Sequence, residues 1–237
     1  MLKAATPEAR PTRGFIRAFS RRMAILSIAI VCAAATARAA AVDEADAAYR
    51  NGRYEDAFKA FFLAAAKGDA FAQYRLGEMY GLGHGVRQDS SRAIKWYGKA
   101  AAQGDLNAQN GLGAAYYDRH DYAKALQCFL KAARAGNAAA QFNAGNMYYN
   151  GDGVTRDYAE AARWYRKAAE LGDARAQNNL GFMYAGGLGF KKDGAQALVW
   201  YKRAAEHGSS EARTALDSLD DSGRAKERVS RFPPRHD

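Results

Sequence analysis

The strongest constraint on the fold of this 237-residue chain is a spacing of about 36 residues that recurs along it. A glycine marks the end of each unit, two alanines precede it, and an aromatic residue stands three positions before the alanines. Such a period is typical of stacked two-helix units, each of which buries its apolar face against its neighbours. The glycines are Gly68, Gly104, Gly136, Gly172 and Gly208, at spacings of 36, 32, 36 and 36.

A second set of positions recurs after these glycines. A glutamine is followed four residues later by a glycine and then by a tyrosine that closes the segment. Apolar residues recur every three or four positions, which predicts helices and not strands. Each unit is therefore expected to hold a first helix of about a dozen residues, a turn and a slightly longer second helix. The recurring residues are Gln73, Gln109, Gln141 and Gln177, then Gly77, Gly113, Gly145 and Gly181, then Tyr80, Tyr116, Tyr148 and Tyr184.

Three of the units contain a long Gly-x-Gly loop between their helices, at 83–86, 151–154 and 187–190. Paired glycines permit positive φ angles, and we expect the apolar residue after them to hold the loop against the core. The aspartate after each loop is a predicted N-cap, and Asp157 with Glu160 is a predicted capping box. The other two N-caps are Asp89 and Asp193.

These positions together resemble a known repeat. The run from Ala72 to Tyr80, the Gly-x-Gly-Val loop, Asp89 and the run from Ala93 to Gly104 resemble a Sel-1-like repeat, the 36-residue relative of the tetratricopeptide repeat. The turns near residues 51 and 119 are shorter and resemble ordinary tetratricopeptide turns. The resemblance covers about residues 45–216. It implies an all-α fold, a right-handed α-solenoid of about five helix pairs with a terminal capping helix.

The repeat divides the chain into three parts. Residues 1–39 are a predicted signal peptide, 40–221 the solenoid, and 222–237 a basic tail predicted to be disordered. The expected repeat units are 42–69, 70–105, 106–137, 138–173 and 174–209, and the expected cap is 210–220.

The formal charge of +10 comes mainly from the two ends of the chain. Subtracting those ends leaves about +1 for the body, so we expect no broad basic face there. Nucleic acid is therefore not an expected partner, because binding it requires many phosphate contacts from lysine and arginine.

The first residues predict export. A basic stretch ends at Arg22, an apolar run covers 23–35, and Ala37-Arg38-Ala39 forms a cleavage motif before Ala40. The run is shorter than the roughly 20 residues that span a bilayer as a helix. The mature protein is therefore expected in the periplasm. An uncleaved membrane anchor, the twin-arginine route and a true start at Met23 remain open.

No set of residues converges as an active site would. The four histidines have no metal-ligand spacing, so neither a metal nor a cofactor is expected. Cys128 is expected to be a small buried apolar residue. The chain is therefore predicted not to be an enzyme. The alternative is a hydrolase acting on the cell wall, like secreted relatives described as β-lactamases, although those carry a disulfide in each repeat.

The predicted function is protein–protein interaction in the bacterial cell envelope, as a scaffold or adaptor. The resemblance implies that the first helices of the units form a concave groove for a peptide or partner domain, with no small-molecule substrate. Asparagine amides bond both donors and acceptors of a peptide backbone, and aromatic rings are common interface hot spots. Proximity to the membrane or cell wall fits this prediction. The predicted contact residues are Phe71, Tyr74, Glu78, Asn107, Asn110, Tyr117, Phe142, Asn146, Tyr149, Arg175, Asn178 and Phe182.

Overall fold

The computed structural model describes residues 39–219, and within that range every regular element is an α-helix. The basic tail lies outside the described residues, as does the predicted signal peptide apart from residue 39. The first helix of each unit is called helix A and the second helix B, and the last helix is named the terminal helix. Helices A are 39–50, α3 (Ala70–Leu82), α5 (Leu106–Asp118), α7 (Ala138–Asn150) and α9 (Ala174–Gly186); helices B are α2 (Tyr54–Ala66), α4 (Ser90–Ala102), α6 (Tyr122–Arg134), α8 (Tyr158–Glu170) and α10 (Gly194–Glu206); the terminal helix is 210–219.

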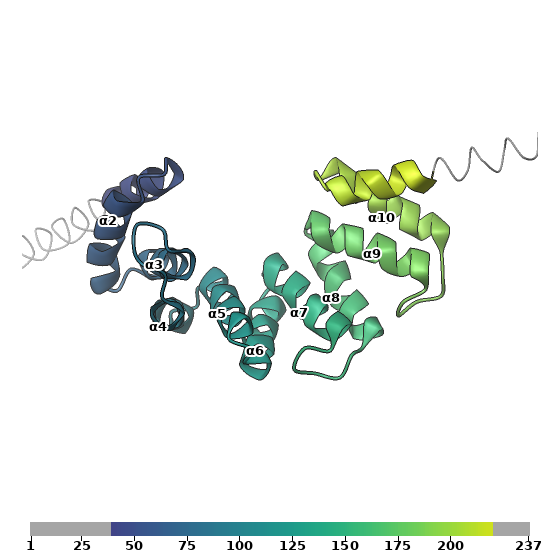
Figure 1. Cartoon of the computed structure of the whole chain (residues 1–237), viewed down its shortest axis with the longest axis horizontal. Coiled ribbons are helices and arrows are strands. Elements are labelled where there is room, and N and C mark those ends of the chain that lie inside the picture. The colour runs from purple at the N-terminus through teal and green to yellow at the C-terminus, as the bar shows by residue number, and fades with distance from the viewer. Residues whose placement is uncertain (1–38, 220–237) are drawn as a thin grey trace, which may run out of the picture.

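The helices follow one another along an open arc, with α2 near one end and α10 near the other (Figure 1). Each helix packs on the next one in the chain, from α2 through to α10. The prediction of an all-α solenoid of helix pairs is confirmed. None of the helices described is long and apolar enough to cross a bilayer.

The helix boundaries follow from local chemistry. The side chains of Asp89, Asp157 and Asp193 each accept a hydrogen bond from the backbone N–H three residues ahead, so these N-caps are confirmed. The glycines after the helices B have φ near 90°, a left-handed conformation that suits glycine.

Two expectations about these helices are wrong. The capping box at Asp157 is only half formed, because the Asp157 N–H donates to the Tyr148 carbonyl and the Glu160 carboxylate pairs with Arg163. The long loop brings the Asp157 N–H back to the end of helix A, where it donates to the Tyr148 carbonyl and is not available to Glu160. The helices B are not longer than the helices A, since α2 to α10 all have 13 residues.

Small and large residues interlock between the two helices of a unit. A Cβ added to Gly77 would lie 2.4 Å from the Tyr97 ring, and one added to Gly181 would lie 2.7 Å from the Tyr201 ring. Real Cβ atoms do not approach so closely, so glycine is what lets each ring lie flat on the facing helix. Gly113 with Phe129 and Gly145 with Tyr165 repeat the arrangement.

Each long loop docks on the unit before it. A Cβ on Gly85 would lie 2.5 Å from the Tyr54 carbonyl oxygen, and Gly189 has the same relation to Tyr158. The second glycine of the loop therefore provides both a positive φ and a close backbone approach. At the end of the last loop, Phe190 stacks on Tyr184 with ring centroids 4.3 Å apart, so it holds the loop to the core as expected.

Buried glutamines connect consecutive units. The side-chain amide of Gln177 donates to the Ala169 carbonyl at 2.9 Å, which ties α9 to the end of α8. The same carbonyl also accepts from the Gly172 N–H, so the glutamine adds a second hydrogen bond at the end of the helix. Gln73 with Ala65 and Gln141 with Ala133 make the same bond.

Candidate partner-binding surface

All of the predicted contact residues lie on helices A, but the structure gathers only some of them around one open space. A hollow of about 490 Å³ is lined by residues of α7 to α10 and of the terminal helix. Four predicted residues line it, namely Asn146, Tyr149, Asn178 and Phe182.

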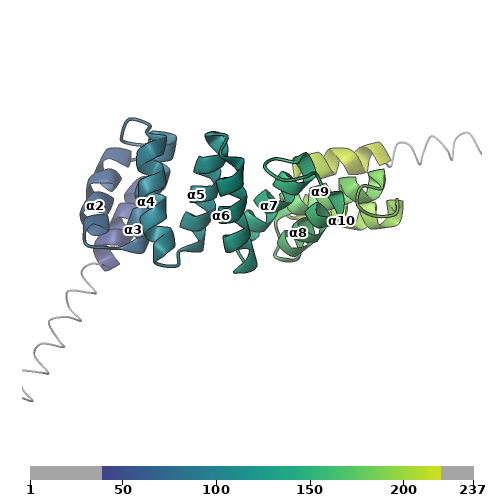
Figure 2. The same cartoon turned by 90° about the horizontal axis from the view of Figure 1, so that it is seen from below.

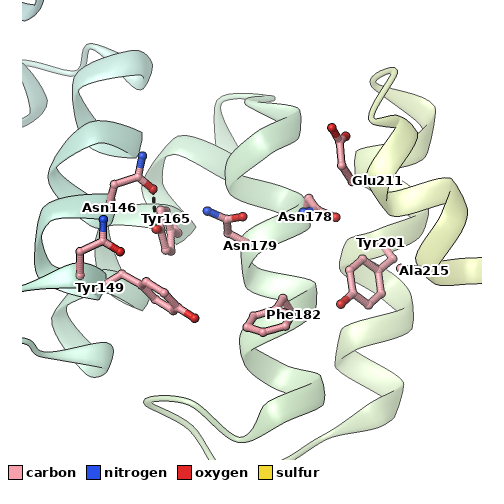
Figure 3. A pocket seen from close by; sticks show the side chains of 10 residues that line it. Asn146, Tyr149, Tyr165, Asn178, Asn179, Phe182, Tyr201, Glu211 and Ala215 are labelled. Carbon is pink, nitrogen blue, oxygen red and sulfur yellow. Dashed lines mark hydrogen bonds between the residues drawn. The ribbon is translucent and has the colours of Figure 1, made fainter. Parts of the chain in front are cut away.

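The side chains around the hollow are ordered by type (Figure 3). Three asparagines form a row from Asn146 through Asn179 to Asn178, and the rings of Tyr149, Phe182 and Tyr201 lie on one side of that row. The Glu211 carboxylate lies near the end of the row, on the terminal helix. The hollow thus combines amide groups, aromatic surface and one negative charge. The other lining residues are Asn150, Tyr165 and Ala215.

Part of the hydrogen-bonding capacity of the row remains open. The Tyr165 hydroxyl donates to Oδ1 of Asn146 at 2.6 Å, and burial raises the pKa of Tyr165, so this hydroxyl keeps its proton. The bond orients Asn146, whose NH₂ group makes no hydrogen bond within residues 39–219. Asn178 makes no side-chain hydrogen bond within residues 39–219, and 53% of Phe182 is exposed.

Glu211 supplies the charge of the hollow. Its own backbone N–H and the hydroxyl groups of Ser209 and Ser210 donate hydrogen bonds that lower the pKa of its carboxyl. The group is therefore ionised at neutral pH and attracts a cation.

The predicted residues of α3 are used within the protein. The Tyr74 hydroxyl donates to Glu78 at 2.6 Å, and Arg75 bonds the other Glu78 oxygen at 2.7 Å. Arg75 also reaches Asp46 on the first helix A at 2.6 Å. Phe71 lies on the same cluster, with the Arg75 guanidinium 5.1 Å from its ring centroid. This part of the surface is a closed network.

In the middle of the array the predicted asparagines join neighbouring helices A. Asn107 accepts a hydrogen bond from Asn137, and Asn110 accepts one from Asn143, both at 2.9 Å. The Tyr117 hydroxyl donates to Asp152 in the next loop at 2.8 Å. These side chains bridge units and are less available to a partner.

The last two predicted residues pack on each other. The Arg175 guanidinium lies over the Phe142 ring, 4.2 Å from its centroid, and pairs with Asp173. The Phe142 ring also packs 5.8 Å from Tyr165. Neither residue lines the hollow.

Reasoning from the repeat alone missed several functional candidates. Asn179 lies next to Asn178, and the Asn-Asn pair in the sequence is a signal for it. Glu211 and Ala215 had no signal, because the terminal helix was interpreted only as a cap. Arg75, the centre of the α3 network, was also missed, because nothing in the repeat marks it.

The reactive side chains show no catalytic arrangement in the described part of the chain. Cys128 is buried, and burial raises the pKa of its thiol, which disfavours the nucleophilic thiolate. His84 stacks on Tyr54 at 4.3 Å and bonds the Tyr49 hydroxyl. Among residues 39–219 no three His, Cys, Asp or Glu side chains are grouped to hold a metal ion.

Comparison with known proteins points to one family. The Sel1 repeat family model matches residues 70–105, 106–137, 138–173 and 174–209. A short segment is 44% identical over 57 residues to an exopolysaccharide production negative regulator of Rhizobium leguminosarum bv. viciae. That segment is 24% of this chain and 21% of the regulator, so the match spans about a fifth of the relative.

Solved structures give matches over most of the array. A Sel1 repeat protein from Oxalobacter formigenes is 35% identical, with a TM-score of 0.71 over 77% of this chain and 76% of that one. A protective antigen of uropathogenic Escherichia coli with an SLR fold is 36% identical, with a TM-score of 0.69 over 79% of this chain and 42% of that one.

Proposed function

This chain belongs to the Sel1 repeat family, whose members are generally non-catalytic protein–protein interaction scaffolds. We propose that it binds an extended peptide segment of a partner protein in the hollow between α7, α9 and the terminal helix. The observation that carries this proposal is the row of asparagine amides beside the exposed ring of Phe182, where Asn178 has no hydrogen-bond partner within the described residues.

The chemistry of the row suits a peptide backbone. An amide side chain donates from its NH₂ group and accepts at its oxygen, so it pairs with both groups of a peptide unit. The Phe182 ring offers exposed apolar area for a partner side chain, at low cost in side-chain entropy. Because helices hold these groups in place, little ordering is needed on binding.

Glu211 adds a preference for charge. Its ionised carboxylate at the end of the amide row favours a partner segment with a lysine or arginine there. The side chain is exposed, so its effect is on selectivity and on the rate of association more than on affinity.

The experiment that tests the hollow uses the double variant Asn178→Ala with Phe182→Ala. Peptides are first selected against the wild-type chain from a random displayed library, and binding of the selected peptides is then measured by titration. We expect the double variant to bind at least about tenfold more weakly, because it loses one backbone pair and one apolar anchor.

A matched control truncates the same kinds of side chain outside the hollow, with Asn51→Ala and Leu82→Ala. Both positions are exposed. Equal peptide affinity in the hollow variant and in the control, with helical content unchanged by circular dichroism, would reject the hollow as the site. A selected set without enrichment in lysine or arginine would reject the role of Glu211.

We also propose that the protein works in the cell envelope after export. The support is the basic stretch, the apolar run 23–35 and the cleavage motif before Ala40. Mass spectrometry of the protein isolated from cells tests this, since cleavage leaves Ala40 as the first residue. An intact N-terminus in a membrane fraction would indicate the tethered alternative, and one in the cytosol would contradict export.

A further inference from the structure

The outer side of the helices B is far more basic than the neutral total for the body suggests. α4 carries Arg92, Lys95 and Lys99 and no acidic residue, and α6 carries Lys124, Lys131 and Arg134 and no acidic residue. The expectation that the body has no broad basic face is therefore wrong for these two helices. The neighbouring helices A do not share this charge, since α7 has no charged residue and α5 has only Asp118.

Four of these cations have no ion-pair partner within residues 39–219, namely Lys95, Lys99, Lys131 and Arg134. The other two, Arg92 and Lys124, pair with the aspartates that cap their own helices. All four unpaired side chains are exposed. They are named the basic face.

An exposed apolar patch adjoins the basic face on α2. Phe62 is 45% exposed and Leu63 is 65% exposed. The Phe62 ring packs edge-on at 6.2 Å against Trp96 of α4, and the Lys99 ammonium lies 4.1 Å from the centroid of the same indole. Phe62, Trp96 and Lys99 thus form one continuous surface across α2 and α4.

Comparison of equivalent positions shows that this patch is specific to the first unit. In the other helices B the position of Leu63 is always a cation. Three of these cations lie over a tryptophan of their own helix, whereas Leu63 has none beneath it. The equivalent residues are Lys99, Lys131, Lys167 and Arg203.

The surface lies on the outside of the curve. Figure 1 shows α6 at the lowest point of the arc, and Figure 2, seen from below, shows α4, α5 and α6 next to one another in that order. The hollow lies elsewhere, between α7, α9 and the terminal helix.

We propose that the basic face and the Phe62–Leu63 patch together bind the surface of an anionic lipid bilayer. The lysines would lie at the phosphate level, where each cation adds attraction to negative headgroups. Phe62 and Leu63 would enter the boundary between headgroups and acyl chains, which is the usual depth for exposed aromatic and aliphatic side chains. Docked in this way, the array presents its hollow away from the membrane face.

A bilayer fits these observations better than a nucleic acid or an acidic protein does. A nucleic acid would neutralise the cations but would leave the neighbouring Phe62 and Leu63 in water, and an acidic protein would need an apolar surface of its own placed against them. The acidic residues Glu55 and Asp56 lie in the first turn of α2, each two helical turns before the apolar residues Phe62 and Leu63. The combination of exposed apolar side chains with neighbouring cations is what favours a lipid surface over the other two partners.

The test is sedimentation of the exported form, which begins at Ala40 under the proposal above, with vesicles of pure phosphatidylglycerol or pure phosphatidylcholine. Residues 1–39 are omitted because their seven basic residues and apolar run would bind vesicles by themselves. We expect binding to the anionic vesicles to weaken at least about tenfold in the variant K95Q/K99Q/K131Q/R134Q. A charge-matched control, R224Q/K226Q/R228Q/R231Q, removes four cations from the C-terminal segment and is expected to weaken binding clearly less than the basic-face variant does. Circular dichroism should show the same helical content for both variants as for the wild type.

A second variant separates the apolar contribution. F62S/L63S is expected to keep binding at low salt but to lose at least about tenfold at high salt, where the cations are screened and apolar contact remains. The proposal is overturned if the variant K95Q/K99Q/K131Q/R134Q sediments with anionic vesicles like the wild type, or if the charge-matched control loses as much binding as that variant does. It is also overturned if the face binds polyuridylate and the protein does not distinguish the two vesicle types.

Discussion

Three positions of the repeat unit occur at both ends of the array with opposite consequences. Tyr74, Arg75 and Glu78 on α3 occupy the places that Asn178, Asn179 and Phe182 occupy on α9. On α3 the side chains bond to one another and to Asp46, so the surface is closed. On α9 they line an open hollow. The repeat therefore specifies where a side chain lies, while its neighbours decide whether a partner can use it.

The largest expected effect on stability comes from removing the ion pairs at the closed end, on α3. Arg75→Met removes the cation between Asp46 and Glu78, whose side chains are 17% and 22% exposed. We expect a loss of about 3 kcal/mol in the free energy of unfolding, since two carboxylates are left close together without their partner. Urea denaturation measures it. Peptide binding in the hollow should not change.

Arg175→Met is the comparison at the open end. Arg175 pairs with Asp173, but 60% of its side chain is exposed, so the expected loss is below about 1 kcal/mol. Similar losses for the two variants would contradict the distinction between a closed and an open end.

A smaller effect tests whether the two ends share one framework. Gly77→Ala and Gly181→Ala each place a methyl group against a ring that has no room for it, and we expect each to cost about 2 kcal/mol. Gly98→Ala on α4 is the control, because nothing lies within 4 Å of its added Cβ, and it should be neutral or stabilising by up to about 1 kcal/mol. Thermal unfolding of the three variants gives the comparison. Unequal costs at Gly77 and Gly181 would mean that the framework is not shared.

The smallest effect compares two asparagines at one repeat position. Asn110→Ala removes a bond between units and leaves the Asn143 amide without that partner, with an expected cost of about 1 kcal/mol. Asn178→Ala removes no bond recorded in the described structure and should cost less than about 0.5 kcal/mol. Denaturation midpoints decide this, and a larger cost for Asn178 would mean that the hollow is part of the structural network.

Local features were predictable because their causes lie close together in the chain. An N-cap such as Asp89 needs only the N–H three residues ahead, and a glycine such as Gly68 needs only its own φ. The pairing of Gly77 with Tyr97 was also predictable in kind, because small and large residues recur at fixed places in every unit. The half-formed capping box at Asp157 failed because a carbonyl nine residues earlier returned to the same N–H.

The candidate surface was predictable only in part. The predicted residues all lie on helices A, whereas helices B and the terminal helix also line the hollow. Four of the predicted residues line it, and the others are engaged in contacts across units or with neighbouring side chains. The contacts across units join residues about 30 positions apart, such as Arg75 and Asp46, and no repeat position indicates them.

By itself, then, the sequence determined the helical units, their caps and the order in which they stack, since each depends on short-range chemistry repeated along the chain. Only the tertiary structure decided which amides stay open, that Glu211 joins the hollow, and that four cations of α4 and α6 have no ion-pair partner within residues 39–219. The physical reason is that availability and surface charge depend on which side chains meet across units. The stacking of the units, and not the pattern within one unit, determines which side chains contact one another across units.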